Sequence, residues 1–223
     1  WSRSDYLPLL DVTGGKERIA AHVHTLALSA PERRRLLDLV PAVHAEKNRF
    51  YTSLVHDGGV PLRPGVARLL DEAEQAGLRL AIASTTSAIN VDALLHATLG
   101  ARGPQRFATI ACGDQVQRKK PAPDVYQLAL RTLGLAPERA VAFEDSHNGL
   151  RAARAAGLWT VVTPTPWTEG HDFRAAGLLL PHLGDQQWPW PAGRGDTAWL
   201  SLSELRRLAA PPVLGGNVVA LNR

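Results

Sequence analysis

Apolar positions in the first sixty residues recur at helical spacing. Ile19, Val23 and Leu26 lie three or four residues apart, which predicts an amphipathic helix over residues 16–28. Ser29-Ala30-Pro31-Glu32 then predicts the start of a second helix with proline in its first turn. Its apolar positions continue to residue 55, and Pro41 predicts a break or kink within it. Residues 1–60 are therefore expected to form a helical domain.

From residue 64 onward, helical and strand patterns alternate. The predicted strands cover residues 78–83, 107–111, 140–143 and 158–163, and the predicted helices cover residues 66–75, 89–99, 123–133 and 148–156. This alternation is typical of an α/β fold with a Rossmann-like parallel sheet and crossover helices, here over residues 61–223. The last part contains a strand candidate at 177–180 and a helix at 201–208. The segment between them, 181–198, is rich in Trp, Pro and Gly and is expected to be irregular.

Two adjacent carboxylates, Glu144 and Asp145, follow the predicted strand at 140–143 and precede a predicted helix. In an open α/β sheet, ligands bind at the carboxyl ends of strands. Two acidic groups there suit a Mg²⁺ ion facing a phosphate. They equally suit the first turn of a helix with no metal bound. The pair alone leaves both interpretations open.

Two further segments place polar groups after strands or before helices. The strand ending at Ala83 is followed by Ser84-Thr85-Thr86-Ser87, and Lys120 directly precedes Pro121 at the start of a predicted helix. Ser84 could donate a hydroxyl to a bound phosphoryl group or cap the following helix. Lys120 could offset phosphoryl charge or lie on the surface as most lysines do.

The order strand-Ser/Thr, Lys-Pro, strand-Glu-Asp closely resembles the second, third and fourth motifs of the haloacid dehalogenase superfamily of phosphohydrolases. Two segments are most similar to its CbbY-like branch, which includes phosphatases of xylulose 1,5-bisphosphate: Gly14-Gly15-Lys16-Glu17-Arg18-Ile19 and Glu144-Asp145-Ser146-x-Asn148-Gly149-Leu150. The resemblance runs from about residue 6 to about residue 163. It implies Mg²⁺-dependent hydrolysis of a phosphorylated sugar through an aspartyl-phosphate, with a helical cap (1–60) over the α/β core.

The resemblance also implies roles for individual core residues. Ser84 would bind the transferring phosphoryl group, helped by the N–H groups of Thr85 and Thr86. Lys120 would offset the phosphoryl charge and hold the carboxylate of the nucleophile. The metal ligands would be Glu144 and Asp145.

Substrate contacts in the cap are expected from basic residues. Lys16, at the glycine-flanked start of a helix, would bind a distal phosphate, and Lys47 and Arg49 on the second helix would contact substrate. Alternatively, each of the three could be a solvent-exposed residue on a helix surface with no contact to substrate. Two basic cap positions would suit a substrate with two phosphates.

The first motif of the superfamily, a hydrophobic strand ending in Asp-x-Asp-Gly-Thr, has no counterpart in the chain. The nearest segment, Leu9-Leu10-Asp11-Val12-Thr13-Gly14-Gly15, leads straight into the first cap helix. We therefore expect a truncated, inactive enzyme that lacks the nucleophile, the acid/base aspartate and the central strand of the sheet. The neighbouring strands would keep unpaired backbone groups and make the chain unstable. The alternatives are a sugar-phosphate mutase and a non-catalytic sugar-phosphate-binding remnant.

Composition narrows the remaining possibilities. The chain has 223 residues, 45% of them hydrophobic, and a net charge of +4 spread among acidic residues, which argues against a nucleic-acid-binding stripe. No apolar run has the length of a membrane span, and no signal peptide is visible. Cys112 is the only cysteine, so an intrachain disulfide is impossible and a buried packing role is expected. We expect a cytoplasmic monomer.

Overall fold

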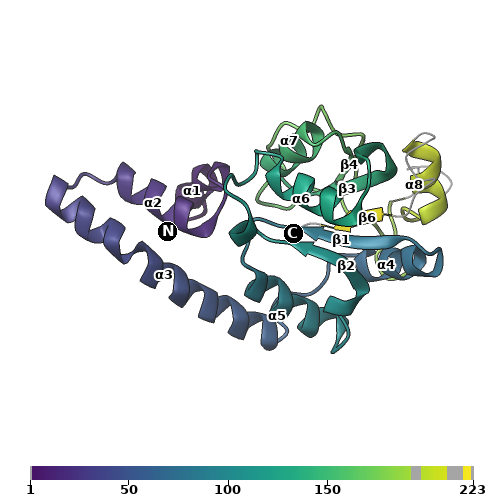
Figure 1. The fold of residues 1–223 in the computed structure, drawn as a ribbon, viewed down its shortest axis with the longest axis horizontal. Helices are drawn as coiled ribbons and strands as arrows, with labels where there is room; N and C mark the ends of the chain where they lie inside the picture. The colour runs from purple at the N-terminus through teal and green to yellow at the C-terminus, as the bar shows by residue number, and fades with distance from the viewer. Residues whose placement is uncertain (1, 192–196, 210–217, 222–223) are drawn as a thin grey trace.

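The computed structural model of the protein describes residues 2–191, 197–209 and 218–221. It shows an α/β fold built on a six-stranded sheet with the order β2-β1-β6-β3-β4-β5, in which every neighbouring pair is parallel (Figure 1). The strands are β1 (Arg79–Ala83), β2 (Phe107–Ala111), β3 (Ala140–Glu144), β4 (Trp159–Val162), β5 (Leu178–Leu179) and β6 (Val218–Leu221). The predicted α/β class is confirmed.

Helix α1 was not predicted, and the later helices follow the predicted order with small shifts at their ends. They are α1 (Arg3–Tyr6), α2 (Gly15–Thr25), α3 (Ala30–His56), α4 (Val66–Gln75), α5 (Ala88–Leu99), α6 (Asp124–Leu133), α7 (His147–Ala155) and α8 (Leu202–Leu208). Short 3-10 turns are η1 (Leu7–Asp11), η2 (Pro104–Arg106), η3 (Gly113–Gln115) and η4 (Pro137–Arg139).

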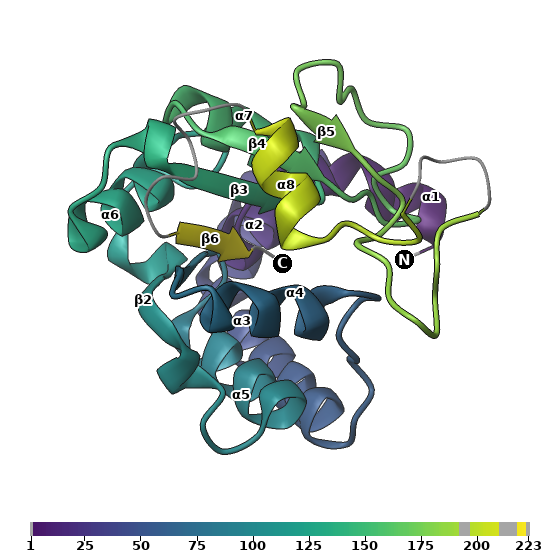
Figure 2. The ribbon, with the colours of Figure 1, turned by 90° about the vertical axis from the view of Figure 1, so that its right-hand side faces the viewer.

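Alternating side chains of each strand divide the core into two layers. In β1, Leu80 and Ile82 join one buried cluster, which includes side chains of α4, α5 and α8. Ala81 and Ala83 face the other way and join a second cluster with α6 and α7. Figure 1 shows α6 and α7 on the opposite side of the sheet from α4 and α5, and Figure 2 shows α8 beside α4. Strands β1, β3 and β4 are buried on both faces, as parallel strands usually are.

The centre of the sheet is filled, although the sequence predicted a gap there. The C-terminal strand β6 pairs in parallel with β1 on one side, through residues 79–82, and with β3 on the other, through residues 140–142. The sequence offered no prediction for this strand. Buried backbone N–H and C=O groups need partners, and a short Val-Val-Ala-Leu strand supplies them. The instability predicted from the sequence assumed unpaired backbone groups on β1 and β3, and β6 pairs with both strands.

The helices before residue 60 extend away from the sheet as an arm (α1–α3, residues 3–56), at the left of Figure 1. Helix α3 begins at a capping box in which the Glu32 carboxylate accepts the Ser29 N–H at 2.9 Å. It runs through Pro41 without the predicted break. Proline removes one hydrogen bond, but α3 packs against both α2 and α5, and this packing keeps the helix continuous.

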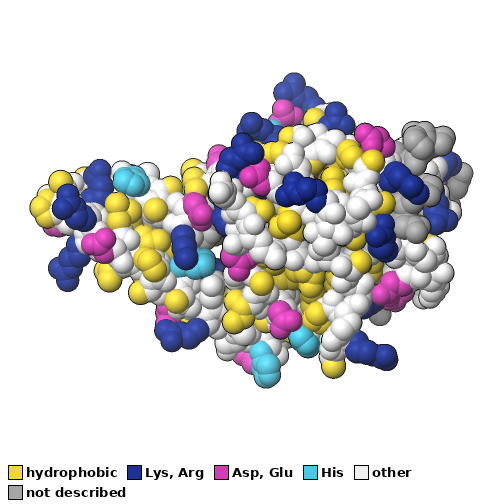
Figure 3. Space-filling model, in the orientation of Figure 1, with side chains coloured by type: hydrophobic (Ala, Val, Ile, Leu, Met, Phe, Trp, Pro, Cys, Tyr) yellow, Lys and Arg dark blue, Asp and Glu magenta, His cyan; other side chains and the backbone are white. Residues whose placement is uncertain are grey.

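The tryptophan-rich segment after residue 180 is irregular where it is described, as predicted. Trp190 is buried and its indole N–H donates to the His182 carbonyl at 2.9 Å, so it serves local packing. Trp188 is 63% exposed. Within the described part of the chain, no helix has the length and apolar character needed to cross a membrane. On the face shown in Figure 3, basic side chains lie scattered among acidic ones over the core.

Candidate active site

The polar segments identified in the sequence meet at the carboxyl edge of the sheet. Strands β1 and β3 both end there, with β6 between them, so Ser84 and Glu144 lie on the same edge. Lys120 enters the site from the loop before α6 and reaches both strands. Segments separated by up to sixty residues in the sequence thus form one polar cluster.

Lys120 and Glu144 form a buried ion pair at the centre of this cluster. The Lys120 Nζ atom lies 2.8 Å from Glu144 Oε1 and donates to the Ala83 carbonyl at 2.9 Å. The hydroxyl of Tyr126, which is buried on α6, donates to the same Glu144 oxygen. Buried charges persist only when they are paired and hydrogen-bonded, and both conditions hold here. Lys120 is therefore not a surface lysine.

Space for the Glu144 carboxylate comes from Gly149 on α7. A Cβ atom at this position would overlap both carboxylate oxygens of Glu144. The N-cap of α7 is Ser146, whose hydroxyl accepts the Gly149 N–H at 3.2 Å. Neither acidic residue caps the helix or lies in its first turn, so the helix-cap interpretation is wrong, while metal binding by the pair stays a prediction.

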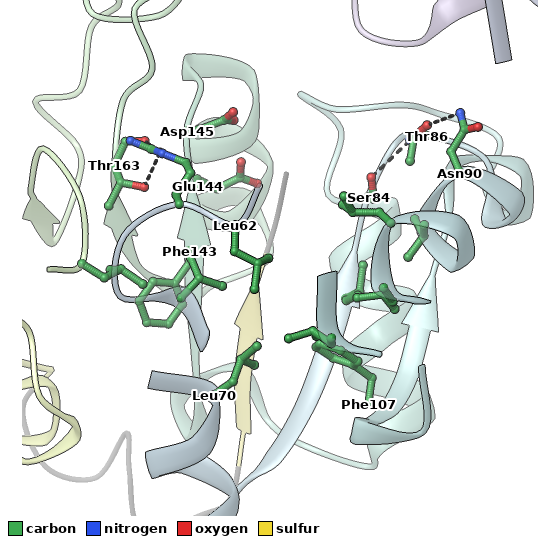
Figure 4. A pocket seen from close by; sticks show the side chains of 18 of the residues that line it. Leu62, Leu70, Ser84, Thr86, Asn90, Phe107, Phe143, Glu144, Asp145 and Thr163 are labelled. Atoms are coloured by element: carbon green, nitrogen blue, oxygen red, sulfur yellow. Dashed lines mark hydrogen bonds between the residues drawn. The ribbon is translucent and has the colours of Figure 1, made fainter. Parts of the chain in front are cut away.

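Asp145 is half-buried next to this ion pair. Burial, and then the negative charge of Glu144, raise the pKa of Asp145, while Lys120 and Arg63 act in the opposite direction. Arg63 is fixed on the β4 side of the site, where its guanidinium donates to the Thr163 hydroxyl at 2.9 Å (Figure 4). The anionic form of Asp145 is thus less stable here than that of an exposed carboxylate, and a nearby cation would stabilise it.

The hydroxyl segment after β1 folds into a compact loop. Ser84 is buried, and its N–H donates to the Ala111 carbonyl at 2.9 Å. The Thr86 N–H donates to Ser84 Oγ at 3.3 Å, so this N–H serves the loop itself, whereas the sequence prediction assigned it to a phosphoryl group. Helix α5 has Ser87 as its N-cap, which removes the alternative role of Ser84 as that cap.

A cleft of about 370 Å³ lies over this edge of the sheet. Its core wall includes Thr85, Lys120 and Asp145, and its other wall includes Tyr6 and Arg18 from the helical arm. The arm is fixed to the core beside the cleft. There the Asn148 side chain of α7 donates to the Asp11 carbonyl at 2.8 Å, and Tyr6 meets Trp167 edge-on with 6.1 Å between ring centroids.

A separate apolar cavity of about 230 Å³ lies below the same polar groups (Figure 4). Leu70, Phe107 and Phe143 line its lower part, and Ser84 and Glu144 line its upper part. This cavity places a low-dielectric environment directly beneath the charged cluster, where electrostatic interactions are stronger than in water.

The three basic residues predicted from the arm have different surroundings. Lys16 and Lys47 both act on His44: burial and these two positive charges lower the pKa of His44. Burial and the charge of Arg18 in turn lower the pKa of Lys47. Arg49 instead lies on an exposed surface and pairs with Glu46.

Arg18 is the basic residue of the arm that lines the cleft, and the sequence reading missed it. Its guanidinium donates to the carbonyls of Leu9 and Val12 at 3.0 and 3.1 Å and to the Tyr6 hydroxyl at 2.8 Å. The CbbY-like motif at residues 14–19 contains Arg18 as well as Lys16, so the sequence held a signal for Arg18 that the prediction did not use.

The described residues fit part of a Mg²⁺ site. Asp145 offers a half-buried carboxylate whose anionic form a cation would stabilise, while Glu144 is already neutralised by Lys120. Mg²⁺ commonly takes one or two carboxylates together with waters and phosphate oxygens. In the part of the chain that the structure describes, no three His, Cys, Asp or Glu side chains form a metal cluster. Further oxygen ligands would have to come from backbone, water or substrate.

The fold, the buried Lys–Glu pair and the adjoining Ser/Thr loop define a hydrolase of phosphate esters, and comparison with known proteins agrees. Residues 12–157 match the model of the haloacid dehalogenase-like hydrolases. The chain belongs to this family.

Several relatives are CbbY proteins. The chain is 49% identical over 211 residues to the plasmid CbbY protein of Cupriavidus necator, covering 92% of this chain and 82% of the relative. It is 50% identical over 183 residues to CbbY of Rhodobacter capsulatus, covering 82% and 78% of the two chains. A solved structure of a CbbY mutant from Rhodobacter sphaeroides with xylulose-(1,5)bisphosphate has a TM-score of 0.75 and 46% identity, covering 82% of this chain and 79% of that one.

Proposed function

We propose that the protein is a Mg²⁺-dependent phosphatase of a phosphorylated sugar, with xylulose 1,5-bisphosphate as the first substrate to test. The observation that carries this proposal is the buried Lys120–Glu144 pair, 2.8 Å apart, with Ser84 and Asp145 on the same sheet edge. The similarity to the Rhodobacter sphaeroides CbbY structure with that bisphosphate supports the choice of substrate.

In this proposal, Ser84 donates its hydroxyl to the transferring phosphoryl group, next to Thr85 and Thr86. Lys120, already held by Glu144, offsets the negative charge that phosphoryl transfer spreads over the oxygens. Asp145 holds Mg²⁺, and Glu144 supports the site from beneath through Lys120. When bound, the ion would neutralise charge on the phosphate oxygens.

The helical arm, residues 1–60, would act as a cap over the core of residues 61–223 and recognise the distal phosphate. Lys16, Lys47 and Arg18 bring positive charge close to His44 and to one another: burial first, and then these charges, lower the pKa of His44 and of Lys47, and a bound anion would offset the charge contribution. Arg49 is paired with Glu46, so we assign it a minor role.

The chain contains no Asp-x-Asp-Gly-Thr segment, so hydrolysis through an aspartyl-phosphate would require an aspartate from outside this sequence. This observation favours a second candidate, a sugar-phosphate-binding protein without catalysis. Calorimetric titration of the chain with xylulose 1,5-bisphosphate, with and without MgCl₂, tests binding alone.

Cys112 as the single cysteine supports a reducing compartment such as the cytoplasm.

The catalytic proposal is tested by joining the chain to a hydrophobic strand that ends in Asp-x-Asp-Gly-Thr. The fused protein is assayed for phosphate release from sugar mono- and bisphosphates, with Asp145→Ala and Ser84→Ala as variants and Thr98→Ala as a remote control. We expect release that requires Mg²⁺ and falls strongly in both site variants. Movement of phosphate within the sugar without release would instead show a mutase, and full activity in Asp145→Ala would refute the assigned site.

A further inference from the structure

Asn90, on the first turn of α5, connects the helical arm to the hydroxyl loop. Its side chain is 2% exposed. The amide nitrogen donates to Asn48 Oδ1 on α3 and to Thr86 Oγ1 in the loop, both at 3.1 Å. Figure 4 shows Asn90 and Thr86 joined in this way at the side of the cavity, next to Ser84. One amide group therefore joins α3 of the arm to the hydroxyl loop of the core. If the arm acts as a cap, these contacts fix its position relative to the loop.

The hydrogen bonds continue from Thr86 to Ser84. The Thr86 N–H donates to Ser84 Oγ at 3.3 Å, so a row of contacts runs from Asn48 through Asn90 and Thr86 to Ser84. In this row, the oxygens of both loop hydroxyls accept hydrogen bonds. A hydroxyl that accepts through one lone pair still has its own proton to donate. The row therefore ties the position of the two loop hydroxyls to the position of α3.

The Asn90 amide presents its NH₂ group to both contacts, Asn48 Oδ1 and Thr86 Oγ1. Among the described residues, the Asn90 Oδ1 atom is buried and has no hydrogen-bond partner. Leaving a buried acceptor unpaired costs free energy. The residue thus gives up one hydrogen bond while holding two others that join the arm to the loop.

We propose that Asn90 is a positioning residue: it couples the position of α3 to the Ser84 loop and thereby holds this loop in place for a phosphoryl group. The part that concerns the phosphoryl group rests on the proposed function. The sequence context of Asn90, inside a predicted helix, gave no sign of this role.

The test uses the chain as it is and needs no catalysis. Amide hydrogen exchange of Thr86, followed by NMR, is compared between the parent and Asn48→Ala, a residue that does not touch Thr86. We expect exchange at Thr86 to become about fivefold faster, as loss of one hydrogen bond allows. Thr52→Ala is the matched control, because the Thr52 hydroxyl donates to the Asn48 carbonyl at 3.0 Å within the same helix. It should leave Thr86 unchanged.

Asn90→Asp replaces the two donors with an acceptor of the same shape and should reverse the direction of the Thr86 hydroxyl. In this variant, Asn48→Ala should have no further effect at Thr86, because the connection is already broken. Titration with inorganic phosphate should show affinity at least about tenfold weaker than in the parent, with Thr98→Ala on the same helix as control. If Asn90→Asp fails to fold, the phosphate affinity of Asn48→Ala is compared with that of the parent and Thr98→Ala instead.

The outcomes separate this proposal from the proposed function. Thr86 exchange that is equal in the parent, Asn48→Ala and Thr52→Ala, or additive effects of the Asn48 and Asn90 substitutions, would overturn the role of Asn90. A parent chain that binds no phosphate, with the Thr86 response intact, would refute the phosphate site and the donor role of Ser84 but leave the coupling of α3 to the loop established.

Discussion

The Lys120 ammonium lies 2.8 Å from Glu144 Oε1, and both side chains are almost completely enclosed by protein. Two parts of the sequence that are 24 residues apart thereby neutralise each other under the candidate catalytic edge. The pair holds Lys120 between the ends of β1 and β3, through the Ala83 carbonyl and Glu144. Folding stability and the geometry of the candidate site therefore both depend on Lys120 and Glu144.

Replacing Lys120 with methionine should destabilise the protein strongly. The substitution leaves the Glu144 carboxylate buried without its cation, which typically costs about 3–5 kcal/mol. Urea unfolding measures the loss. Arg118→Ala is the control, because the Arg118 side chain in the Arg118–Asp124 pair is 72% exposed, and ion pairs at the surface contribute about 0–1 kcal/mol.

The double variant Lys120→Met/Glu144→Gln tests the cause of this loss. Removing both charges should recover part of the stability, because the cost arises from one unpaired buried charge. Equal and additive losses in the two single variants would show that packing, and not the ion pair, determines the effect.

Gly149→Ala should displace the Glu144 carboxylate. The added methyl group would overlap the Glu144 oxygens, and overpacking of this kind costs about 1–3 kcal/mol. Thermal unfolding gives the comparison with Gly170→Ala, where no atom lies within 4 Å of the added Cβ. The control should stay within about 0.5 kcal/mol of the parent. Similar losses in both variants would contradict the assigned role of Gly149.

Cys112 should resist thiol reagents while the protein is folded. The side chain is buried, and burial raises its pKa to about 11, so very little thiolate is present at pH 8. The reaction with Ellman's reagent at pH 8 should be slow in the native protein and fast in urea. A rapid native reaction would show that the thiol is accessible and acidic, against both observations.

Much of the site could be predicted from the sequence because its signals are local. Ser84, Lys120 and Asp145 each stand next to a strand end or a helix start, and parallel strands bring such positions to one edge. The direction of the Glu144 side chain could not be predicted in this way. This direction depends on a hydrogen bond from Tyr126, whose sequence pattern indicates only an apolar position of α6. It also depends on the absence of a side chain at Gly149, which leaves space for the Glu144 carboxylate.

The central strand shows the limit of local patterns most clearly. Val218–Leu221 is four residues long, and nothing in its composition distinguishes a central strand from an edge. Its position is determined by pairing with β1 and β3, which are distant in sequence. Likewise, Arg18 and Lys16 have the same charge and lie two residues apart, and only the fold shows that Arg18 lines the cleft.

Asp145→Asn should stabilise the protein at neutral pH. Burial and the charge of Glu144 raise the pKa of Asp145 above the value of 3.8 expected for the unfolded chain. The folded state therefore binds more protons just above pH 3.8, and stability falls as pH rises through this window. Each unit of increase in the pKa corresponds to about 1.4 kcal/mol at high pH.

The pH dependence provides the check. Urea unfolding from pH 3 to pH 7 should show the parent and Asp145→Asn converging below pH 4 and separating above it. Asp172→Asn is the control with the opposite sign, because hydrogen bonds from Arg174 lower the pKa of exposed Asp172. An Asp145→Asn variant that is less stable than the parent at pH 7 would rule out the electrostatic cost assigned to this carboxylate.

Magnesium should reverse the cost that Asp145 imposes. A divalent cation bound to this carboxylate stabilises its anionic form, and a ligand at one hundred times its Kd stabilises the folded state by about 2.7 kcal/mol. We expect MgCl₂ to raise the melting temperature of the parent well above that in NaCl of equal ionic strength. Asp145→Asn should lose this increment, because an amide carries no charge to hold the ion. An equal Mg²⁺ effect in both proteins would place the ion elsewhere and separate Asp145 from metal binding.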